Sequence, residues 1–551
     1  MTDDLIGQAR AWLAEDPDEQ TRAELESLIG RADAGDAEAR DDLADRFGTT
    51  LQFGTAGLRG ALGAGPNRMN RVVVLRAAAG LAQYLQDTGA TAPVVIGYDA
   101  RHNSDVFARD TAEVMAGAGI EALLLPHPLP TPVLAFAILD LGCSAGVMVT
   151  ASHNPAIDNG YKVYLGDGSQ IVPPADHDIA ARIEAVGALA DVPRGSDFRT
   201  LDEAVVDRYL TSLAAVPPDG PRDLTIVYTA MHGVGGAVAL QALERAGFPA
   251  PSVVAQQQEP DPDFPTVAFP NPEEPGAIDL SLALAAEVGA DLVIANDPDA
   301  DRCAAAVPDP DGTWRMLRGD EVGALLGHDL LSRGVDGTYA TSIVSSSLLG
   351  RMAAEHNQTY VETLTGFKWI GRLEHLVFGY EEALGYCVDP AHVKDKDGLS
   401  AMLRLAALAA ELKASGKTMR DRLDEIAARF GLHATDQISV RVDDLAQIGE
   451  MMERLRASPP SSFGGFAVET LEDLSAGTAD LPPTDGLRYV LAGHDDVERA
   501  RVIVRPSGTE PKLKTYLEVV VPVRGDAAAA RATARTALDE LKDAFKATAG
   551  L

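Results

Sequence analysis

The chain has 551 residues, of which 46% are hydrophobic and 23% charged, an ordinary composition for a globular protein. This length exceeds what one hydrophobic core accommodates, so we expect roughly three to five domains. The net charge of −35, from 82 acidic and 47 basic side chains, disfavours binding to nucleic acid or anionic membranes, and it would repel a phosphorylated substrate unless basic side chains gather locally.

The sequence carries no sign of export or membrane insertion. The segment from Met1 to Leu5 is acidic and lacks the basic and apolar regions of a signal peptide. The most apolar stretch, from Val133 to Leu141, is too short for a membrane span. The cysteines are widely separated and are expected to be buried and reduced: Cys143, Cys303 and Cys387. We therefore expect a soluble cytoplasmic protein.

Acidic helices are predicted up to about Asp45, and short apolar runs then alternate with helical patterns. This alternation predicts βαβ units with largely parallel or mixed sheets. In order, the predicted elements are strand 93–98, helix 105–115, strands 121–125, 146–149 and 224–228, helix 237–245, strand 252–255, helix 280–287, strands 292–294 and 338–341, and helix 347–355. After Gly431 the pattern changes to half-exposed strands 439–442 and 501–504 and a helix over 527–545, which indicates a small α+β domain.

The segment Thr150 to Pro155 presents a hydroxyl where a buried strand ends. Asn154 and Pro155 stop the strand and favour a turn. Ser152 is therefore expected at the mouth of a loop, a frequent place for catalytic side chains on α/β scaffolds.

Three carboxylates alternate in the loop after the predicted strand 292–294, at Asp297, Asp299 and Asp301. Ionised carboxylates this close repel one another, and a divalent cation that accepts oxygens from all three removes the repulsion. A calcium loop of the EF-hand type is excluded, because Arg302 stands where that loop requires glycine. Mg²⁺ shared with a phosphate oxygen is favoured, and a solvated acidic turn is the alternative.

Two later segments carry groups suited to a phosphorylated sugar. Arg505 offers a planar fork to phosphate oxygens, and the hydroxyls and flexible backbone that follow would complete a phosphate cradle: Ser507, Gly508 and Thr509. An incidental Ser-Gly turn is the alternative. The segment from Phe378 to Tyr386 holds two adjacent glutamates that could accept hydrogen bonds from sugar hydroxyls, although such glutamates usually have no chemical role.

These motifs together resemble those of the α-D-phosphohexomutase superfamily, in the same order and over nearly the whole chain. Thr150–Pro155 resembles the phosphoserine loop, Asp297–Arg302 the metal loop, Gly379–Gly385 the sugar loop and Arg505–Thr509 the phosphate loop. Further segments are similar to the branch that contains the longer phosphoglucomutases and phosphopentomutases: 53–60, 231–236 and 365–369.

The resemblance implies three similar α/β domains with mixed sheets plus a C-terminal α+β domain, arranged around a central cleft. We place the domains at residues 1–195, 196–310, 311–431 and 432–551. The implied enzyme interconverts a hexose 1-phosphate and a hexose 6-phosphate through a phosphoserine and a bisphosphate intermediate. Glucose is the first candidate sugar. A phosphomannomutase, a phosphopentomutase or a metal-dependent sugar phosphatase is the alternative.

The resemblance also implies roles for individual residues. Ser152 would carry the phosphoryl group, and one Mg²⁺ would be held by Ser152 and the three aspartates, with a sugar 1,6-bisphosphate as activator. The other catalytic candidates are His153, Arg59, Lys162 and Lys396. The substrate-binding candidates are Arg302, Thr365, Gly366, Glu381, Ala383, Lys396, Arg505, Ser507, Gly508 and Thr509. A small phosphosugar is the only partner expected, for a monomer or weak homodimer.

The chain departs from some relatives in the sugar loop, where Ala383, Leu384 and Tyr386 occupy a region that elsewhere holds a serine and a histidine. Lys396 is then a substitute candidate for the general base, which would require a lowered pKa. Glu381 rather than Glu382 suits the family's Glu-Glu-x-x-Gly spacing.

Adjacent residues on extended backbone point apart, so His153 is expected to contact phosphate rather than to activate Ser152. A serine hydrolase is disfavoured, because Ser152 lacks the flanking glycines of a nucleophile elbow. A binding protein without catalysis would not need Ser152 together with the three metal carboxylates.

Overall fold

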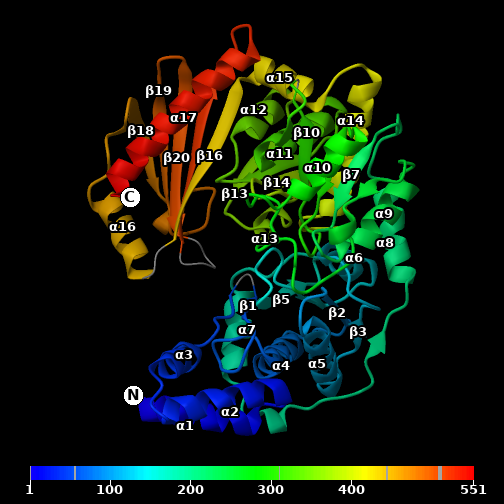
Figure 1. The fold of residues 1–551 in the computed structure, drawn as a ribbon, viewed down its shortest axis with the longest axis vertical. Coiled ribbons are helices and arrows are strands. Elements are labelled where there is room, and N and C mark those ends of the chain that lie inside the picture. Colours follow the sequence, from blue (N-terminus) through cyan, green and yellow to red (C-terminus); the bar gives the residue numbers. More distant parts are fainter. Residues whose placement is uncertain (1, 55–56, 310, 442–444, 507–511, 551) are drawn as a thin grey trace. The chain divides into compact units, whose positions relative to one another are not determined.

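The computed structural model describes residues 2–54, 57–309, 311–441, 445–506 and 512–550 (Figure 1). The chain divides into two compact units. The first contains Met1–Met316 and Gly385–Glu411, and the second contains Leu317–Leu384 and Leu412–Leu551. No helix in the described ranges is both long enough and apolar enough to cross a membrane.

The first unit begins with helices α1 (Thr2–Glu15), α2 (Glu19–Asp33) and α3 (Ala37–Phe47), which lie together (Figure 1). Asp18 and Asp36 precede α2 and α3, and each side chain accepts a backbone N–H of the first turn. Apolar side chains meet between the helices, with Trp12 and Phe47 in edge-to-face contact at 6.1 Å. The predicted acidic helices are therefore present.

A mixed sheet with the strand order β1-β5-β4-β2-β3-β6 follows. Its central strands β3, β2 and β4 are parallel, and β5 runs antiparallel to β4. The elements are β1 (Leu58–Ala61), α4 (Arg71–Asp87), β2 (Val94–Tyr98), α5 (Ser104–Gly117), β3 (Ala122–Leu124), α6 (Thr131–Asp140), β4 (Ala145–Val149), β5 (Asp158–Leu165), α7 (Ala175–Glu184), the 3₁₀ turn η1 (Leu189–Asp191) and β6 (Arg199–Thr200). Strand β4 is buried along its whole length, as parallel central strands are.

The second sheet has the order β11-β10-β9-β7-β8, in which β7 is parallel to β8 and β9 while β10 is antiparallel to β9. Its elements are α8 (Ala204–Ala214), β7 (Ile226–Thr229), α9 (Gly235–Arg245), β8 (Ser252–Val253), η2 (Ala255–Gln257), α10 (Asp279–Val288), β9 (Leu292–Ala295), β10 (Ala304–Pro308) and β11 (Trp314–Met316). The predicted strand 252–255 is shorter than expected, because the chain turns into η2 at Ala255.

The second unit contains a third sheet in which β12 lies between β13 and β14 and is parallel to both. Its elements are α11 (Gly319–Ser332), β12 (Thr338–Ser342), α12 (Leu348–Glu355), β13 (Thr359–Thr363), α13 (Phe367–Ile370), β14 (Leu376–Glu381) and α15 (Met419–Phe430). Strand β15 (Gly385–Cys387) and most of α14 (Gly398–Ala414) belong to the first unit.

The C-terminal part of the second unit is an antiparallel sheet in the order β16-β21-β20-β19-β18-β17. Its elements are β16 (Leu432–Arg441), α16 (Leu445–Ala457), β17 (Ser462–Phe463), β18 (Phe466–Asp473), η3 (Leu474–Ala476), β19 (Leu487–His494), β20 (Val497–Pro506), β21 (Lys512–Val521) and α17 (Ala527–Ala549). Helix α17 crosses one face of this sheet (Figure 1).

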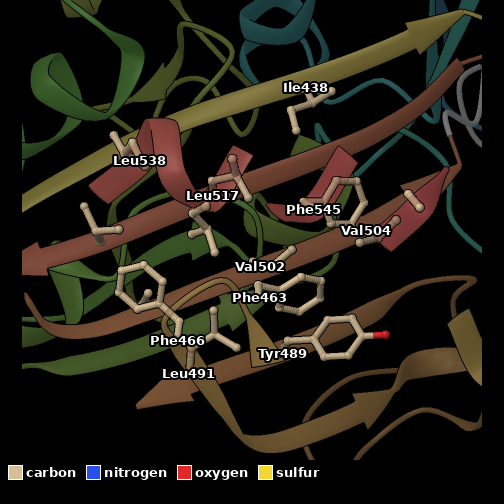
Figure 2. Packing of buried hydrophobic residues seen from close by; sticks show 14 of the residues in the cluster. Ile438, Phe463, Phe466, Tyr489, Leu491, Val502, Val504, Leu517, Leu538 and Phe545 are labelled. Carbon is tan, nitrogen blue, oxygen red and sulfur yellow. The ribbon is translucent and has the colours of Figure 1, made fainter. Parts of the chain in front are cut away.

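Figure 2 shows the core beneath α17, where Phe463 lies near Tyr489 and Phe545. The ring centres are 5.1 Å and 6.0 Å apart, and the first pair is edge-to-face. Residues 439–441 and 501–504 of the two predicted strands belong to the longer strands β16 and β20, and residue 442 lies outside the described residues. Burial alternates over 437–441 in β16, whereas residues 502–504 of β20 are all buried.

The first three sheets place comparable loops at comparable positions. In each, a loop follows the strand that lies beside β2, β7 or β12: residues 150–157 after β4, 296–303 after β9 and 382–384 after β14. Each loop contains a non-glycine residue with left-handed backbone, namely Ser152 (φ 53°), Ala300 (φ 53°) and Leu384 (φ 65°). Such backbone is costly for these residue types and persists only where surrounding contacts impose it.

Candidate active site

Ser152 lies three residues beyond β4, with its hydroxyl buried and directed at the second sheet of the same unit. Its Oγ donates to Asp297 Oδ2 at 2.9 Å, although 145 residues separate the two in sequence. Its N–H donates to Thr150 Oγ1 at 2.9 Å, which stabilises the left-handed turn. The structure thus brings the predicted phosphoserine and the predicted metal loop into direct contact.

His153 lies against the Ser152 hydroxyl, with Nδ1 3.2 Å from Oγ. The expectation that these two side chains point apart is wrong. It assumed extended backbone, whereas Ser152 adopts φ 53°. Burial, followed by the charges of Arg302 and Arg59, lowers the pKa of His153 well below its ordinary value. The ring is therefore neutral, and because the Ser152 hydroxyl donates to Asp297, the tautomer with its proton on Nδ1 can donate to Ser152 Oγ.

Arg101 holds the phosphoserine loop by its backbone, a contact that the sequence motifs did not reveal. Its guanidinium donates to the carbonyl oxygens of Ser152 and Asn154, both at 2.6 Å, and to those of Pro155 at 2.8 Å and Asp158 at 3.1 Å. Arg101 follows β2, whose parallel neighbour β4 precedes Ser152. The sequence signal that could have identified Arg101 as a site residue is its place in the loop just after a parallel strand.

The three carboxylates of the predicted metal loop converge. Asp297, Asp299 and Asp301 are fully buried, and one oxygen from each lies within 4.8 Å of the others. The left-handed residue Ala300 turns the chain between the last two. The loop therefore gathers three carboxyl groups at one buried place.

Lys162 on β5 supplies the nearest positive charge to this cluster. Its Nζ lies 2.7 Å from Asp299 Oδ2 and 3.1 Å from Asp301 Oδ2, and Thr131 Oγ1 also donates to Asp299 Oδ2 at 2.7 Å. Burial would lower the pKa of Lys162, but the two carboxylates raise it above its ordinary value. Asp299 and Asp301 have lowered pKa values, because the nearby cations outweigh burial. Burial and the other two carboxylates raise the pKa of Asp297 well above the ordinary value.

The cluster fits a divalent metal ion. Oδ1 of Asp299 and Oδ1 of Asp301 are buried and accept no hydrogen bond from the described residues, a costly arrangement for ionised oxygens. Carboxylate oxygens are the ligands that Mg²⁺ prefers in proteins. Two unsatisfied oxygens beside a third carboxylate are what an ion at this place would use.

Arg59 and Arg302 complete a positive lining around the hydroxyl. Arg59, on β1, donates to Asn154 Oδ1 at 3.2 Å. Arg302 Nε lies 3.8 Å from Asp297 Oδ2 and from Asp301 Oδ1. Burial and the neighbouring arginines lower the pKa of Arg59, although Asp299 opposes this change. The structure thus gathers basic groups locally in a strongly acidic chain, as a phosphorylated substrate requires.

Lys396 joins the same cluster from the segment after β15. Its Nζ lies 3.2 Å from Asp301 Oδ2 and 3.2 Å from Asp395 Oδ1. Asp395 is itself fixed by the hydroxyl of Tyr164 and the amide of Gln170, each at 2.7 Å. The role of Lys396 as general base stays a prediction, and its pairing with Asp301 would have to break first.

The sugar loop lies in the second unit, where Glu381 ends β14. Glu381 Oε1 accepts the Gly366 N–H at 2.7 Å, so the predicted residues Glu381, Thr365 and Gly366 come together. Glu382 instead faces two serine hydroxyls, from Ser342 at 3.3 Å and Ser345 at 3.2 Å. Ala383 offers no polar side-chain group. Of the two glutamates, Glu381 has fewer hydroxyl partners among the described residues.

Arg505 lines a cavity of about 220 Å³ in the same unit, with Thr365, Lys368 and Trp369 on its wall. The Thr365 hydroxyl is buried and has no hydrogen-bond partner among the described residues. The other predicted members of the phosphate loop lie outside the described residues: Ser507, Gly508 and Thr509.

Comparisons with known proteins agree over most of the chain. Residues 50–189, 207–312 and 318–430 match phosphoglucomutase/phosphomannomutase α/β/α domains I, II and III, and residues 438–535 match the C-terminal domain. A probable phosphomannomutase of Haemophilus influenzae is 52% identical over 457 residues, which cover 82% of this chain and 93% of the relative. The phosphopentomutase of Homo sapiens is 34% identical over 574 residues, covering 94% and 92%. A crystal structure of a putative phosphomannomutase from Thermus thermophilus matches with a TM-score of 0.71 at 25% identity, covering 90% of this chain and 99% of that one.

Proposed function

Because the chain belongs to the phosphoglucomutase/phosphomannomutase family and is a phosphosugar mutase, we propose that it interconverts α-D-glucose 1-phosphate and glucose 6-phosphate. The observation that carries the chemical part of the proposal is the contact of the Ser152 hydroxyl with Asp297, next to the basic side chains of Lys162, Arg59 and Arg302. Mannose and pentose phosphates are the alternative substrates, since relatives bear the names phosphomannomutase and phosphopentomutase.

In the proposed reaction Ser152 carries a phosphoryl group on Oγ. Attack by the free sugar hydroxyl breaks the Oγ–P bond and forms a sugar O–P bond, which gives a bisphosphate, while the hydroxyl proton passes to a basic group. The bisphosphate then returns its other phosphoryl group to Oγ, which leaves the isomeric monophosphate. A bisphosphate supplied from solution would phosphorylate an enzyme that has lost its phosphoryl group.

The residues around Ser152 would stabilise the negative charge on the transferring phosphoryl group and would hold the reacting atoms in place. Lys162, Arg59 and Arg302 would balance charge on the transferring group, and Arg101 keeps the Ser152 backbone in place. Ser152 and the three aspartates would hold one Mg²⁺, which when bound neutralises phosphoryl oxygens. Glu381 would accept sugar hydroxyls, and Arg505 would bind the phosphate that is not reacting.

The test combines intact-protein mass spectrometry with a coupled assay. Wild-type protein should carry one phosphate, and it should convert glucose 1-phosphate when a trace of glucose 1,6-bisphosphate is present. Ser152→Ala should lose the phosphate and about 10⁴-fold or more in kcat. Ser169→Ala is a matched control, since Ser169 is buried in the same sheet region and its hydroxyl has no partner among the described residues.

The outcomes separate the candidate functions. Release of inorganic phosphate without isomer formation would indicate a phosphatase instead of a mutase. Substantial turnover by Ser152→Ala would remove Ser152 from the mechanism. Rates with glucose, mannose and pentose phosphates, compared side by side, decide the substrate.

A further inference from the structure

Residues 342–347, which comprise the last residue of β12 and the loop after it, contact the sugar loop and are here called the serine loop. The serine loop follows β12, which pairs with β14, and Arg101 likewise follows β2, which pairs with β4. Arg101 holds the phosphoserine loop through backbone carbonyls. The comparable position suggests that the serine loop holds the loop that contains Glu381 and Glu382.

Ser345 fixes Glu382 at two points. Its Oγ accepts the Glu382 N–H at 3.0 Å and lies 3.2 Å from Glu382 Oε2, as a donor to that carboxylate. Ser342 Oγ adds a contact of 3.3 Å to the same oxygen. Backbone and side chain of Glu382 are therefore both attached to the serine loop. Because Glu381 is its chain neighbour, the serine loop also determines where Glu381 lies.

The serine loop is in turn held by Arg501 of β20, a strand of the C-terminal sheet. Arg501 donates to the carbonyl oxygen of Ser345 at 2.5 Å and to that of Ile343 at 3.2 Å. The guanidinium is oriented by an ion pair with Glu518 on β21 at 3.0 Å, and the two side chains are 12% and 4% exposed.

Glu518 is itself fixed to the serine loop. It accepts the Ser346 hydroxyl at 2.7 Å and the Ser347 N–H at 2.8 Å. Burial would raise the pKa of Glu518, but Arg501 and His433 lower it well below its ordinary value. The carboxylate is therefore ionised and keeps the guanidinium in one orientation. Planar, paired guanidinium groups are well suited to such fixed geometry.

We propose that Arg501 is a positioning residue for sugar binding, which acts through Ser345 and Glu382 to orient Glu381 without touching the substrate itself. The inference rests on the proposed function of Glu381 as the sugar contact. It assigns part of the control of sugar affinity to the C-terminal domain, at a residue outside the phosphate loop. Loss of the Ser345 hydroxyl should release Glu382, and loss of the Arg501 guanidinium should release the whole serine loop.

The experiment measures equilibrium binding, so that it does not depend on turnover. Calorimetric titration with glucose 1-phosphate is done on full-length protein in a Ser152→Ala background, which cannot transfer phosphate. Ser345→Ala and Arg501→Met should each weaken the Kd about tenfold, and in the Ser152 enzyme they should raise KM more than they lower kcat. Arg501→Lys should restore part of the affinity, because an ammonium can still reach a carbonyl or Glu518.

Two matched controls distinguish positioning from general stability. Ser347→Ala removes a hydroxyl of the same loop that faces His433 at 3.2 Å and contacts neither Glu382 nor Arg501 by any described bond. Arg488→Met removes a neighbouring arginine that pairs with Glu362 at 2.8 Å and with Glu472 at 2.5 Å. Glu362 also lies 3.5 Å from Arg501, so this control perturbs a shared carboxylate but removes neither the Ser345 nor the Glu518 contact of Arg501. Both controls should leave the Kd unchanged, even if the unfolding temperature falls.

The outcomes are separable. If the Ser152→Ala protein itself binds no sugar phosphate, the proposed function fails. If it binds and Ser345→Ala binds equally well, the inference is wrong while the proposed function stands. An Arg488→Met loss as large as that of Arg501→Met would also overturn the inference, since domain attachment would then explain both. If Arg501→Met does not fold, Ser345→Ala decides, because it leaves the Arg501–Glu518 pair intact.

Discussion

Lys162→Met tests the electrostatics of the carboxylate cluster directly. Lys162 lies 2.7 Å from Asp299 and 3.1 Å from Asp301, both fully buried. At an effective dielectric constant of about 20, each contact has a gross Coulomb energy of about 5 to 6 kcal/mol. Desolvation of the ammonium offsets much of this energy, and removal of one partner of a buried pair costs about 3 to 5 kcal/mol. In EDTA the variant should therefore unfold at a clearly lower temperature than the wild type.

Mg²⁺ should offset the loss of stability that Lys162→Met causes in EDTA. Without Lys162, no ammonium competes with a cation for the oxygens of Asp299, and only Lys396 still competes at Asp301, so Mg²⁺ should bind more tightly. A ligand that binds only the folded state stabilises it by RT ln(1 + [L]/Kd), about 2.7 kcal/mol at a hundredfold excess over Kd. Saturating Mg²⁺ should thus raise the unfolding temperature of Lys162→Met by more than that of the wild type.

The assay is thermal unfolding with EDTA and with a series of Mg²⁺ concentrations. Lys417→Met is the matched control, because Lys417 pairs with Glu425 on the surface, where such pairs contribute about 0 to 1 kcal/mol. Equal unfolding temperatures of wild type and Lys162→Met in EDTA would refute the electrostatic reasoning. So would an equal gain from Mg²⁺ in both proteins.

Three further predictions concern residues around the site. Arg101→Met should lower the free energy of unfolding by about 3 to 5 kcal/mol and should reduce the fraction of protein phosphorylated on Ser152, measured by mass spectrometry. An unchanged phosphorylated fraction would show that Arg101 does not position Ser152. In Gly233→Ala the new Cβ would lie 2.3 Å from Pro298 Cα and would displace the loop that holds Asp297 and Asp299, so half-maximal activity should need about tenfold more Mg²⁺. Gly187→Ala is the control, because its Cβ would meet no atom within 4 Å and should leave the Mg²⁺ requirement unchanged. Burial raises the pKa of Asp397 to about 6, so the folded state keeps a proton that the unfolded state releases, and stability falls as pH rises from about 4 to about 6. Asp397→Asn should therefore gain stability relative to wild type over this range in urea unfolding, and a constant difference would contradict the assignment.

Much of the fold followed from local patterns. The parallel strands β2, β3, β4, β7 and β9 lie close to their predicted positions because buried parallel strands are short, continuous apolar runs bounded by loops. Strands β1, β5, β6, β10 and β11 of the same two sheets were not predicted. The four-domain α/β architecture and the family resemblance are confirmed. The domain boundaries stay a prediction. The strands β16 and β20 are longer than predicted, because neither alternates along its whole length: residues 432–436 are all half-buried, and residues 502–504 are all buried.

The sequence by itself determined the groups that are close in the chain. Asp297, Asp299 and Asp301 are spaced within one loop, so their convergence needed no knowledge of the rest of the protein. The same holds for Ser152 at the end of a strand.

Only the tertiary structure decided which distant groups meet and how each side chain is turned. Strand order brings Arg101 beneath the phosphoserine loop, and it brings Asp297 to the hydroxyl of Ser152. A left-handed backbone turns His153 toward that hydroxyl, against the expectation for extended chain. Arg501 reaches Ser345 across 156 residues. The physical reason is that spacing along a loop fixes short-range geometry, whereas contacts between strands depend on how all the buried faces pack together.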